Sequence, residues 1–132
     1  MKSFHLQIVT PDGLYYEGEA EKLIVRASTG DVCILANHID YVTPLGMGEA
    51  RVTIDGKVRT AACIGGMLSV CKNQVRLVPT TFEWAEEIDA QRAERALSAA
   101  EARLPSAKDR HEQAIIEAKI KRALVRSNVA KK

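Results

Sequence analysis

Hydrophobic and polar residues alternate strictly near the start of the chain. Phe4, Leu6 and Ile8 are separated by polar residues, so one face of an extended segment is apolar and the other is polar. The segment EKLIVRA, residues 21–27, repeats this two-residue period. Such alternation is typical of strands with one buried face, and it predicts that the chain begins with β structure.

Turn sequences divide the first 84 residues into short strands. Proline and glycine mark a turn at residues 10–13, and a second turn lies at residues 28–31. Asp55 and Gly56 separate ARVTI from KVRTAACI, and residues 73–74 separate MLSVCK from VRLVP, which predicts two tight hairpins. Turns about every ten residues, with no helical pattern between them, favour a β-sandwich or a barrel.

From residue 87 onward, apolar residues recur at intervals of three and four instead of two. The first helical stripe ends at Pro105, and a short connection over residues 106–109 precedes a second stripe. A link this short predicts two antiparallel helices. The stripe residues are Ala93, Ala96, Leu97, Ala100 and Leu104 in the first helix, and Ile116, Ile120, Ala123 and Leu124 in the second.

The predicted fold is therefore β + α: an N-terminal antiparallel β-sandwich over residues 1–84, followed by a C-terminal antiparallel two-helix hairpin over residues 85–132. All eight glycines and all the aromatic residues (one Trp, three Tyr and two Phe) lie in the first part. Alanine supplies much of the first helical stripe, and a buried methyl group contributes only about 0.8 kcal/mol. We therefore expect the hairpin to be held shut weakly and to be able to open.

Composition and charge exclude several classes of protein. A hydrophobic content of 46% and a charged content of 27% are globular values, and a net charge of +2 is too small to indicate a nucleic-acid-binding protein. No apolar run approaches the roughly 18 residues of a membrane-spanning helix. The N-terminus lacks the apolar core of a signal peptide. Residues 85–132 are the more basic part, with eleven Lys and Arg against eight Asp and Glu.

The residues that most often carry chemistry are scattered. Cys33, Cys63 and Cys71 lie in apolar, strand-like runs without CxxC spacing, so we expect buried, reduced thiols in a cytoplasmic protein. The three histidines form no metal-ligand pattern, and we expect no metal site. Ser69 and Lys72 match SxxK, but that chemistry needs both side chains on one helical face, and the local period is that of a strand. We expect no catalytic residues.

Several motifs occur together and in order along the whole chain. They are TPDG followed by YEGEA in residues 10–20, the segment GGMLSV in residues 65–70, and IDAQRA in residues 88–93. In this arrangement the chain resembles the epsilon subunit of bacterial F-type ATP synthase. The resemblance implies a non-catalytic rotor (central-stalk) subunit that couples ion translocation to ATP synthesis. It also implies a peripheral location on the cytoplasmic face of the cell membrane, while the choice between protons and sodium ions lies in the ring.

The resemblance implies different partners for the two parts. The sandwich would bind the gamma subunit and rest on the membrane rotor ring without entering the membrane. The hairpin would fold against the sandwich, or extend along gamma and block rotation in the hydrolytic direction. When it is extended, basic residues would meet the catalytic alpha and beta subunits, although a solvated helix face is the usual role of such a charge run. These residues are Lys119, Lys121, Arg122 and Arg126.

The chain departs from the family pattern around one loop. Cys33 stands where the family usually has glycine, and residues 36–40 read ANHID where it usually has a segment like Pro-Gly-His-Ala-Pro. The loss of both prolines should leave this loop less fixed. The resemblance places Asp31 and His38 on an edge that faces the rotor ring, while a plain surface-turn role would explain either residue equally well.

The stretch IDAQRA is either only a helix start or also part of a nucleotide site. If the hairpin turn is centred near residue 107 and both helices rise equally per residue, Arg92 lies roughly opposite Arg122, and Asp89 lies roughly opposite Val125 and Arg126. An ion pair between Asp89 and an arginine, with Asp89 also capping its helix, would explain these residues. The surplus of positive charge, in contrast, would attract a polyphosphate.

In some members of the family, IDxxRA and such arginines bind ATP, with the adenine near the motif and the phosphates on the arginines. No cofactor is expected to be required, so ATP would be a regulatory ligand. Ala99 and Ile115 stand where ATP-binding relatives have arginine, and we therefore expect weaker binding here. The ATP-binding residues that the resemblance implies are Ile88, Asp89, Arg92, Ala93, Arg122, Arg126 and Glu83.

Two functions of other classes stay open. A free-standing nucleotide-sensing protein would bind ATP without joining a rotor. A nucleic-acid binder with a basic C-terminal tail is the second, but the balanced charge and the lack of exposed aromatic platforms on the sandwich argue against it. We therefore expect no nucleic-acid partner.

Overall fold

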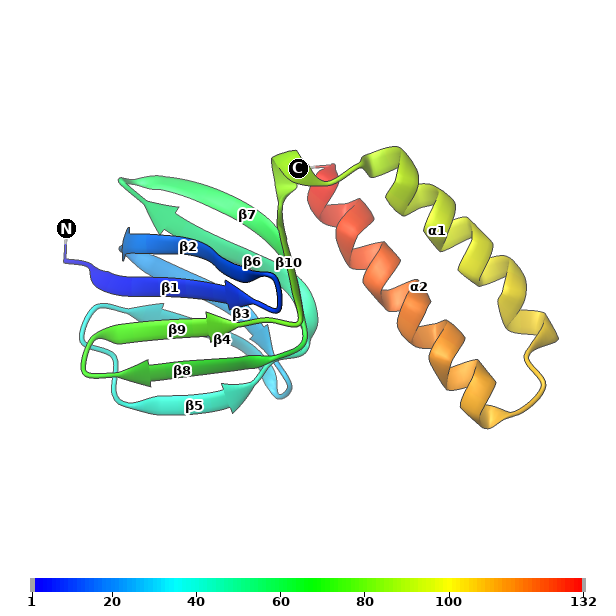
Figure 1. Cartoon of the computed structure of the whole chain (residues 1–132), viewed down its shortest axis with the longest axis horizontal. Helices are drawn as coiled ribbons and strands as arrows, with labels where there is room; N and C mark the ends of the chain where they lie inside the picture. The colour runs from blue at the N-terminus through cyan, green and yellow to red at the C-terminus, as the bar shows by residue number, and fades with distance from the viewer. Residues whose placement is uncertain (1, 132) are drawn as a thin grey trace. The chain divides into compact units, whose positions relative to one another are not determined.

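The computed structural model describes residues 2–131, and the chain divides into two compact units, Met1–Trp84 and Ala85–Lys132. Strands make up the first unit, and two helices with short connections make up the second (Figure 1). This confirms the predicted fold, a β-sandwich followed by a two-helix hairpin.

The strands of the first unit form two five-stranded sheets. Sheet A has the strand order β2-β1-β9-β8-β5, and sheet B has the order β10-β7-β6-β3-β4. The strand bounds are β1 Phe4–Thr10, β2 Gly13–Ala20, β3 Lys22–Ala27, β4 Gly30–Leu35, β5 Tyr41–Pro44, β6 Met47–Ile54, β7 Lys57–Ile64, β8 Met67–Cys71, β9 Gln74–Val78 and β10 Thr81–Trp84.

Neighbouring strands are antiparallel except for β1 and β9, which pair in parallel. The expected pattern was antiparallel throughout, and this one pair departs from it. Parallel neighbours need a long crossover between them. The chain supplies that crossover because β3, β4, β6 and β7 belong to the other sheet, so that β9 returns beside the first strand from the same end.

The two predicted hairpins form, but one turns earlier than expected. Asp55 and Gly56 close the β6–β7 hairpin as predicted, both with positive φ (51° and 76°). In the β8–β9 hairpin Lys72 and Asn73 form the turn instead of residues 73–74, with φ values of 49° and 64°. Oδ1 of Asp40 accepts the backbone N–H of Lys72 at 3.0 Å, which fixes this turn.

The sandwich core lies between the two sheets and consists of large apolar side chains. Leu6 and Ile8 on β1 are completely buried, as are Leu23 on β3 and Leu68 on β8. Gly66 lies in the link between β7 of sheet B and β8 of sheet A, and it packs against the end of β9. Its φ is 99°, and a Cβ there would overlap the backbone oxygen of Val78. Only glycine fits this position, because a side chain has neither the conformation nor the space.

The expectation of three buried thiols is wrong for two of the cysteines. Cys63 is buried, and burial raises the pKa of its thiol to about 12. Cys33 and Cys71 are exposed. They lie on strands next to Ile34 and Val70, which face the core, and the two-residue period therefore turns both cysteines outward.

The second unit is an antiparallel helical hairpin. Its helices are α1 Ala90–Arg103 and α2 Arg110–Ala130, with 3-10 turns η1 Ala85–Glu87 before α1 and η2 Leu104–Ser106 after it. Asp109 caps α2, because its Oδ1 accepts the backbone N–H of Glu112 at 2.8 Å. Pro105 lies in the first positions of η2, where its missing N–H is not needed.

Small side chains make up much of the interface between α1 and α2. Ala93 and Ala100 are the buried residues of α1, and Ile116 and Ala123 are buried on α2. Leu124 was expected to face α1, but its side chain is 44% exposed. Successive helix positions differ by about 100°, and the burial of Ala123 turns Leu124 away. The hairpin thus buries less apolar surface than its sequence pattern suggested.

Candidate functional site

A basic groove of about 270 Å³ lies between α1 and α2. We call it the hairpin groove. Alanines and basic residues line it together. The alanines are Ala96, Ala99, Ala100 and Ala123, and the basic residues are Arg103, Lys119, Arg122 and Arg126.

The spacing of the α2 residues explains the groove. Lys119, Arg122 and Arg126 recur at intervals of three and four, which places them on one face of the helix. Opposite them, Ala99 has only a methyl group, so the space between the helices is not filled. The basic residues of α2 were predicted from the sequence, but Arg103 was not; it lies one turn beyond Ala99 and Ala100, at the end of α1.

The groove joins the arginines of α2 with a part of α1 that lies nearer the hairpin turn than Arg92. The rise per residue of the two helices predicts that Arg122 lies opposite Arg92. The groove is instead lined by Arg122 and Arg126 together with residues of α1 between 96 and 103. Side chains of a helix lean toward its N-terminus. Because α2 begins at the hairpin turn, its long side chains lean toward that turn and away from the start of α1. The lining of the groove therefore does not include IDAQRA.

The stretch IDAQRA forms the start of α1. Asp89 has extended backbone angles, and its Oδ1 accepts the backbone N–H of Arg92 at 3.1 Å, so it is the N-cap. Ile88 is half-buried and donates its backbone N–H to the oxygen of Ala85 at 3.3 Å. Ala93 is buried within the hairpin. The capping role expected for Asp89 is confirmed, while a role in binding ATP stays a prediction.

Glu83, the last of the implied ATP-binding residues, belongs to the other unit. It lies on β10 and pairs with Ala62 of β7. Its side chain is partly buried.

Two residues were expected at the ring-facing edge: Asp31 lies near the start of β4, an edge strand of sheet B, and His38 lies in the loop after β4. Asp31 accepts a hydrogen bond from Nε of Arg26 at 2.7 Å. The His38 ring lies 5.9 Å from the ring of Tyr41. Six residues at about 3.3 Å each form β4, so the two residues are at opposite ends of one edge and do not share a compact site. Their contact with a ring stays a prediction.

The loop at residues 36–40, expected to be less fixed without its prolines, is held by side chains. Oδ1 of Asn73 accepts the backbone N–H of Asn37 at 2.6 Å, and Asn37 takes a positive φ of 63°. Asn73 also donates from Nδ2 to the oxygen of Ser3 at 3.1 Å. Hydrogen bonds to the β8–β9 turn thus supply the restraint that the prolines would have supplied.

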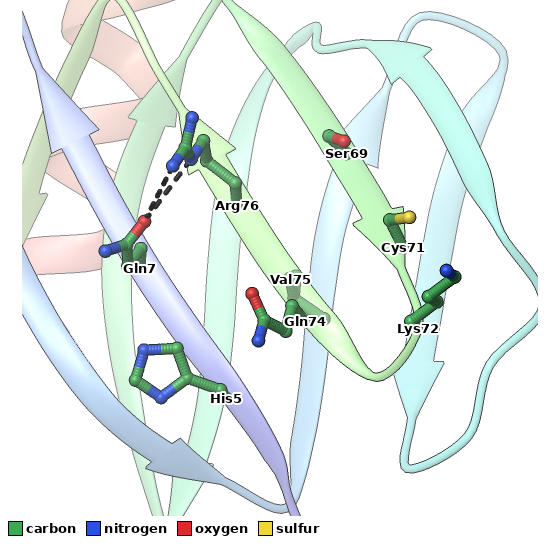
Figure 2. A pocket seen from close by; sticks show the side chains of 8 residues that line it. All are labelled: His5, Gln7, Ser69, Cys71, Lys72, Gln74, Val75 and Arg76. Carbon is green, nitrogen blue, oxygen red and sulfur yellow. Dashed lines mark hydrogen bonds between the residues drawn. The ribbon is translucent and has the colours of Figure 1, made fainter.

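A second hollow, of about 360 Å³, lies on the outer face of sheet A. Figure 2 shows its polar lining, including Gln7, Gln74 and Arg76 over β1 and β9. Arg76 donates from Nε and Nη2 to Oε1 of Gln7 at 3.3 and 3.2 Å. Next to Gln7, Nε2 of His5 lies 2.9 Å from Oε2 of Glu17.

The charges of this network shift the pKa values of its members. The hydrogen bond to Glu17 raises the pKa of His5, and the same contact lowers the pKa of the Glu17 carboxyl. The side chains of His5 and Glu17 are both exposed, so the network is a solvated surface feature. Ser69 and Cys71, which line the same hollow, lie on β8. Of the SxxK match, Ser69 lies on β8, as the strand period predicts, and Lys72 lies in the turn that follows.

Two kinds of feature are absent from residues 2–131. No group of three or more His, Cys, Asp or Glu side chains in this range could hold a metal ion. None of the helices in the same range is long and apolar enough to cross a membrane.

Comparisons with known proteins agree with the two-unit structure. Residues 3–85 match the family model of the ATP synthase delta/epsilon chain β-sandwich domain, and residues 86–131 match that of the ATP synthase delta/epsilon chain long α-helix domain. An ATP synthase epsilon chain of Caldanaerobacter subterraneus subsp. tengcongensis is 39% identical over 132 residues, which cover 99% of this chain and 96% of the relative. The epsilon chain of Bacillus velezensis is 41% identical over 130 residues, 98% of each chain.

A chain in the cryo-EM structure of the Euglena gracilis mitochondrial ATP synthase has the same fold. The TM-score is 0.84 at 21% identity, and the match covers 98% of this chain and 82% of that chain. Because family models match both units and bacterial relatives match over nearly the full length, this chain belongs to the ATP synthase delta/epsilon chain family, among its epsilon chains.

Proposed function

We propose that this chain is a rotor subunit of a bacterial F-type ATP synthase, which links the central stalk to the membrane ring and regulates ATP hydrolysis through its hairpin. The observation that carries the proposal is the match over both units to epsilon chains of bacterial ATP synthases. The chain itself is non-catalytic, and catalysis belongs to other subunits of the complex. It would lie on the cytoplasmic face of the membrane as a peripheral protein.

The two units would have separate roles. The sandwich, with its large buried core, would be the rigid part that binds gamma and rests on the ring. Asp31 and His38, along the exposed edge of sheet B, would face the ring. The hairpin, with its small apolar interface, would be the part that opens, extends along gamma and blocks hydrolytic rotation.

Truncation tests this division. A chain that ends at Glu87 keeps every strand of the sandwich. We expect it to stay folded, bind gamma and support assembly, while inhibition of ATP hydrolysis by the complex is reduced. Loss of gamma binding in the truncated chain would contradict the proposed roles.

The basic residues of α2, Lys119, Lys121, Arg122 and Arg126, would contact acidic surfaces of the alpha and beta subunits when the hairpin is extended. Changing Lys119 and Lys121 to glutamine should weaken inhibition, and more so at low salt, because charges are screened over about 10 Å at 0.1 M ionic strength. Lys22→Gln with Lys57→Gln is a matched control, since both lysines are exposed on the sandwich. Equal inhibition by both variants at every salt concentration would mean that the α2 lysines only solvate the helix.

ATP would be the regulatory ligand of the hairpin. A ligand that binds only the closed hairpin stabilises it by RT ln(1 + [L]/Kd), about 2.7 kcal/mol at a hundredfold excess over Kd. This is comparable to the burial of a few methyl groups at about 0.8 kcal/mol each, so ATP could decide the conformation of so small an interface.

Affinity purification from membranes distinguishes the rotor from a free-standing nucleotide sensor. We expect the tagged chain to recover an ATPase in which gamma is its direct cross-linking neighbour. Recovery of the chain alone, with retained ATP binding, would support the sensor.

A further inference from the structure

The hollow on the outer face of sheet A, which we call the sheet A hollow, has a lining rich in hydrogen-bond donors. It includes Ser69 and Cys71 of β8, Gln74 and Arg76 of β9, and Lys72 in the turn between these strands (Figure 2). Arg76 pairs with Ser69 across the ladder, and Gln74 pairs with Cys71. A long side chain therefore stands beside a short one in both rows, which leaves the hollow over β8.

The positive charge of the sheet A hollow is not neutralised within the described chain. Among residues 2–131, no carboxylate lines the hollow, and none pairs with the Arg76 guanidinium or the Lys72 ammonium. Glu17, on the neighbouring strand β2, is already engaged by His5 at 2.9 Å and by Gln7 at 2.8 Å. The hollow therefore presents two cations whose counter-charge has to come from another molecule.

A chain of hydrogen bonds orients the Arg76 side chain. Gln7 donates from Nε2 to Oε2 of Glu17 at 2.8 Å, which fixes the orientation of its amide. The amide oxygen of Gln7 accepts from Nε and Nη2 of Arg76 at 3.3 and 3.2 Å (Figure 2). A guanidinium has five N–H donors, so further donors on Arg76 stay available to a ligand. Because the side chain is already held, it loses less conformational freedom when it binds.

We propose that the sheet A hollow binds the side-chain carboxylate of an aspartate or glutamate on a protein partner. The carboxylate accepts hydrogen bonds from the Arg76 guanidinium and the Ser69 hydroxyl, and the Lys72 ammonium adds positive charge beside it. This inference goes beyond the proposed function, because it concerns a face of the sandwich to which that function assigns no partner.

A carboxylate fits this set of donors. Guanidinium groups form paired hydrogen bonds with planar carboxylates. Residues directly opposite each other in a ladder have Cβ atoms about 4.5–5.5 Å apart, so one carboxylate can reach both Arg76 and Ser69. Phosphate sites commonly use the free backbone N–H groups of a helix N-terminus or a nest. Here the lining comes from strands whose neighbours pair with them on both sides, and side chains supply the donors.

Exposed apolar side chains beside the hollow favour a protein over a free anion. Met67 and Val78 pair with each other two residues along from Ser69 and Arg76, so all four side chains point to the same face. Met67 is 43% exposed and Val78 is 39% exposed. Val42, which pairs with Ser69 from β5, is 62% exposed. A protein segment that carries the carboxylate can cover these side chains, whereas a small anion cannot.

Titration of the full chain, followed by its amide NMR spectrum at fixed pH and ionic strength, tests the proposal. The probes are a tetraglutamate peptide, its tetraglutamine counterpart and inorganic phosphate. We expect tetraglutamate alone to shift the amide signals of residues 69–76 saturably at millimolar concentration, because a solvated ion pair contributes little free energy.

The first pair of variants removes one positive charge. Arg76→Gln should weaken the binding of tetraglutamate by about tenfold, because it removes the charged hydrogen-bond donor. Arg51→Gln is the matched control. It removes the same charge from an exposed strand residue of sheet B, where the guanidinium already pairs with Glu49 at 2.6 Å. We expect the control to leave binding unchanged.

The second pair of variants keeps the charge constant. Cys71→Leu fills the hollow and should abolish the shifts of residues 69–76. Cys33→Leu makes the same change at an exposed position of β4 in the other sheet and should leave the shifts unchanged. The amide spectrum itself shows whether each variant is folded.

Carbodiimide coupling tests for the partner in the complex isolated from membranes. This reagent joins a carboxylate to a neighbouring lysine through an amide bond. We expect a cross-linked product with a partner subunit that is lost in Lys72→Arg and kept in Lys57→Arg, since Lys57 is exposed on the sandwich outside the hollow. If the complex forms but gives no product that depends on Lys72, no partner carboxylate occupies the hollow, and the rotor role is unaffected.

Three results of the titration would also overturn the inference. Equal shifts with tetraglutamine would show that the hollow does not recognise a carboxylate. Tighter binding of phosphate at residues 69–76 would make the hollow a site for a phosphate-bearing ligand instead. Equal effects of Arg76→Gln and Arg51→Gln, or of the two leucine variants, would place the carboxylate elsewhere. Failure to recover any complex would reject the rotor role, while the titration would still decide whether the hollow binds a carboxylate.

Discussion

The sandwich and the hairpin are stabilised in different ways. The sandwich buries a continuous core of leucine, isoleucine, valine and aromatic side chains between two sheets. The hairpin buries mainly alanines, with Ile116 and Val129 as its larger buried residues. A buried Leu side chain contributes roughly 1.5–3 kcal/mol, against about 0.8 kcal/mol for a methyl group. One chain therefore combines a rigid unit with a unit that little energy holds closed.

The difference in buried apolar surface between the two units indicates which of them a ligand can regulate. Ligands and partners contribute a few kcal/mol, which is small against the core of a sandwich but comparable to an alanine interface. A ligand can therefore change the conformation of the hairpin but not that of the sandwich. Four substitutions would break or sharpen this contrast.

The largest effect is expected in the sandwich core. Leu68→Ala removes a completely buried side chain and should lower the free energy of unfolding by about 2–5 kcal/mol. Leu124→Ala is the matched change in the hairpin, where the side chain is 44% exposed, and it should have a much smaller effect. Urea denaturation of the full chain measures both. Similar losses for the two variants would remove the contrast between the units.

The second effect concerns backbone contact within the sandwich. Gly66→Ala should cost more than Gly56→Ala, although both glycines have positive φ. An L-residue in the left-handed region costs about 1–2 kcal/mol in either case. At Gly66 the new methyl group would also overlap the backbone of Val78, whereas nothing lies within 4 Å at Gly56. Thermal unfolding gives the difference, and equal costs would mean that the strands separate easily at this bend.

The third effect is local to the hairpin. Asp89→Ala removes the N-cap of α1 and should destabilise that helix by about 1 kcal/mol. Hydrogen exchange should show faster exchange in α1, with unchanged protection in the strands, because the two units are separate compact bodies. Asp12→Ala, in the exposed turn after β1, is the control. Loss of protection in both units would indicate that the hairpin and the sandwich unfold together.

The smallest effect is a pH dependence of the sandwich surface. The pKa of His5 is raised by Glu17, so its contribution to stability is present below the ordinary pKa and is lost as pH rises through the raised value. The pKa of Glu17 is lowered, so its contribution is present above the ordinary pKa and is lost as pH falls through the lowered value. Stability from this pair is therefore greatest in mildly acidic solution.

His5→Gln tests this dependence. The substitution should flatten the decrease in unfolding free energy between mildly acidic and mildly alkaline pH, measured by denaturation at several pH values. His111→Gln, exposed on α2, should leave the dependence unchanged. An unchanged slope in His5→Gln would show that the exposed pair does not contribute.

The residues of the candidate site were predictable in part. The intervals between Lys119, Arg122 and Arg126 placed three cations on one helical face, and Asp89 was correctly identified as a helix cap. Arg103 was missed, since a single arginine at a helix end has no distinctive pattern. The pairing of Arg122 with Arg92 stays a prediction, while the groove joins Arg122 with Ala96, Ala99, Ala100 and Arg103.

The sequence by itself determined the two-unit architecture, because periods of two and of about 3.6 residues express which face of each element is buried. It also determined the Asp55–Gly56 hairpin and the cap at Asp89, which depend on local backbone chemistry. Only the tertiary structure decided the turn at Lys72 and Asn73, since either turn leaves Val70 and Val75 facing inward. The outward cysteines, the parallel pairing of β1 with β9 and the lining of the hairpin groove likewise depend on contacts between residues far apart in the chain, which local patterns do not encode.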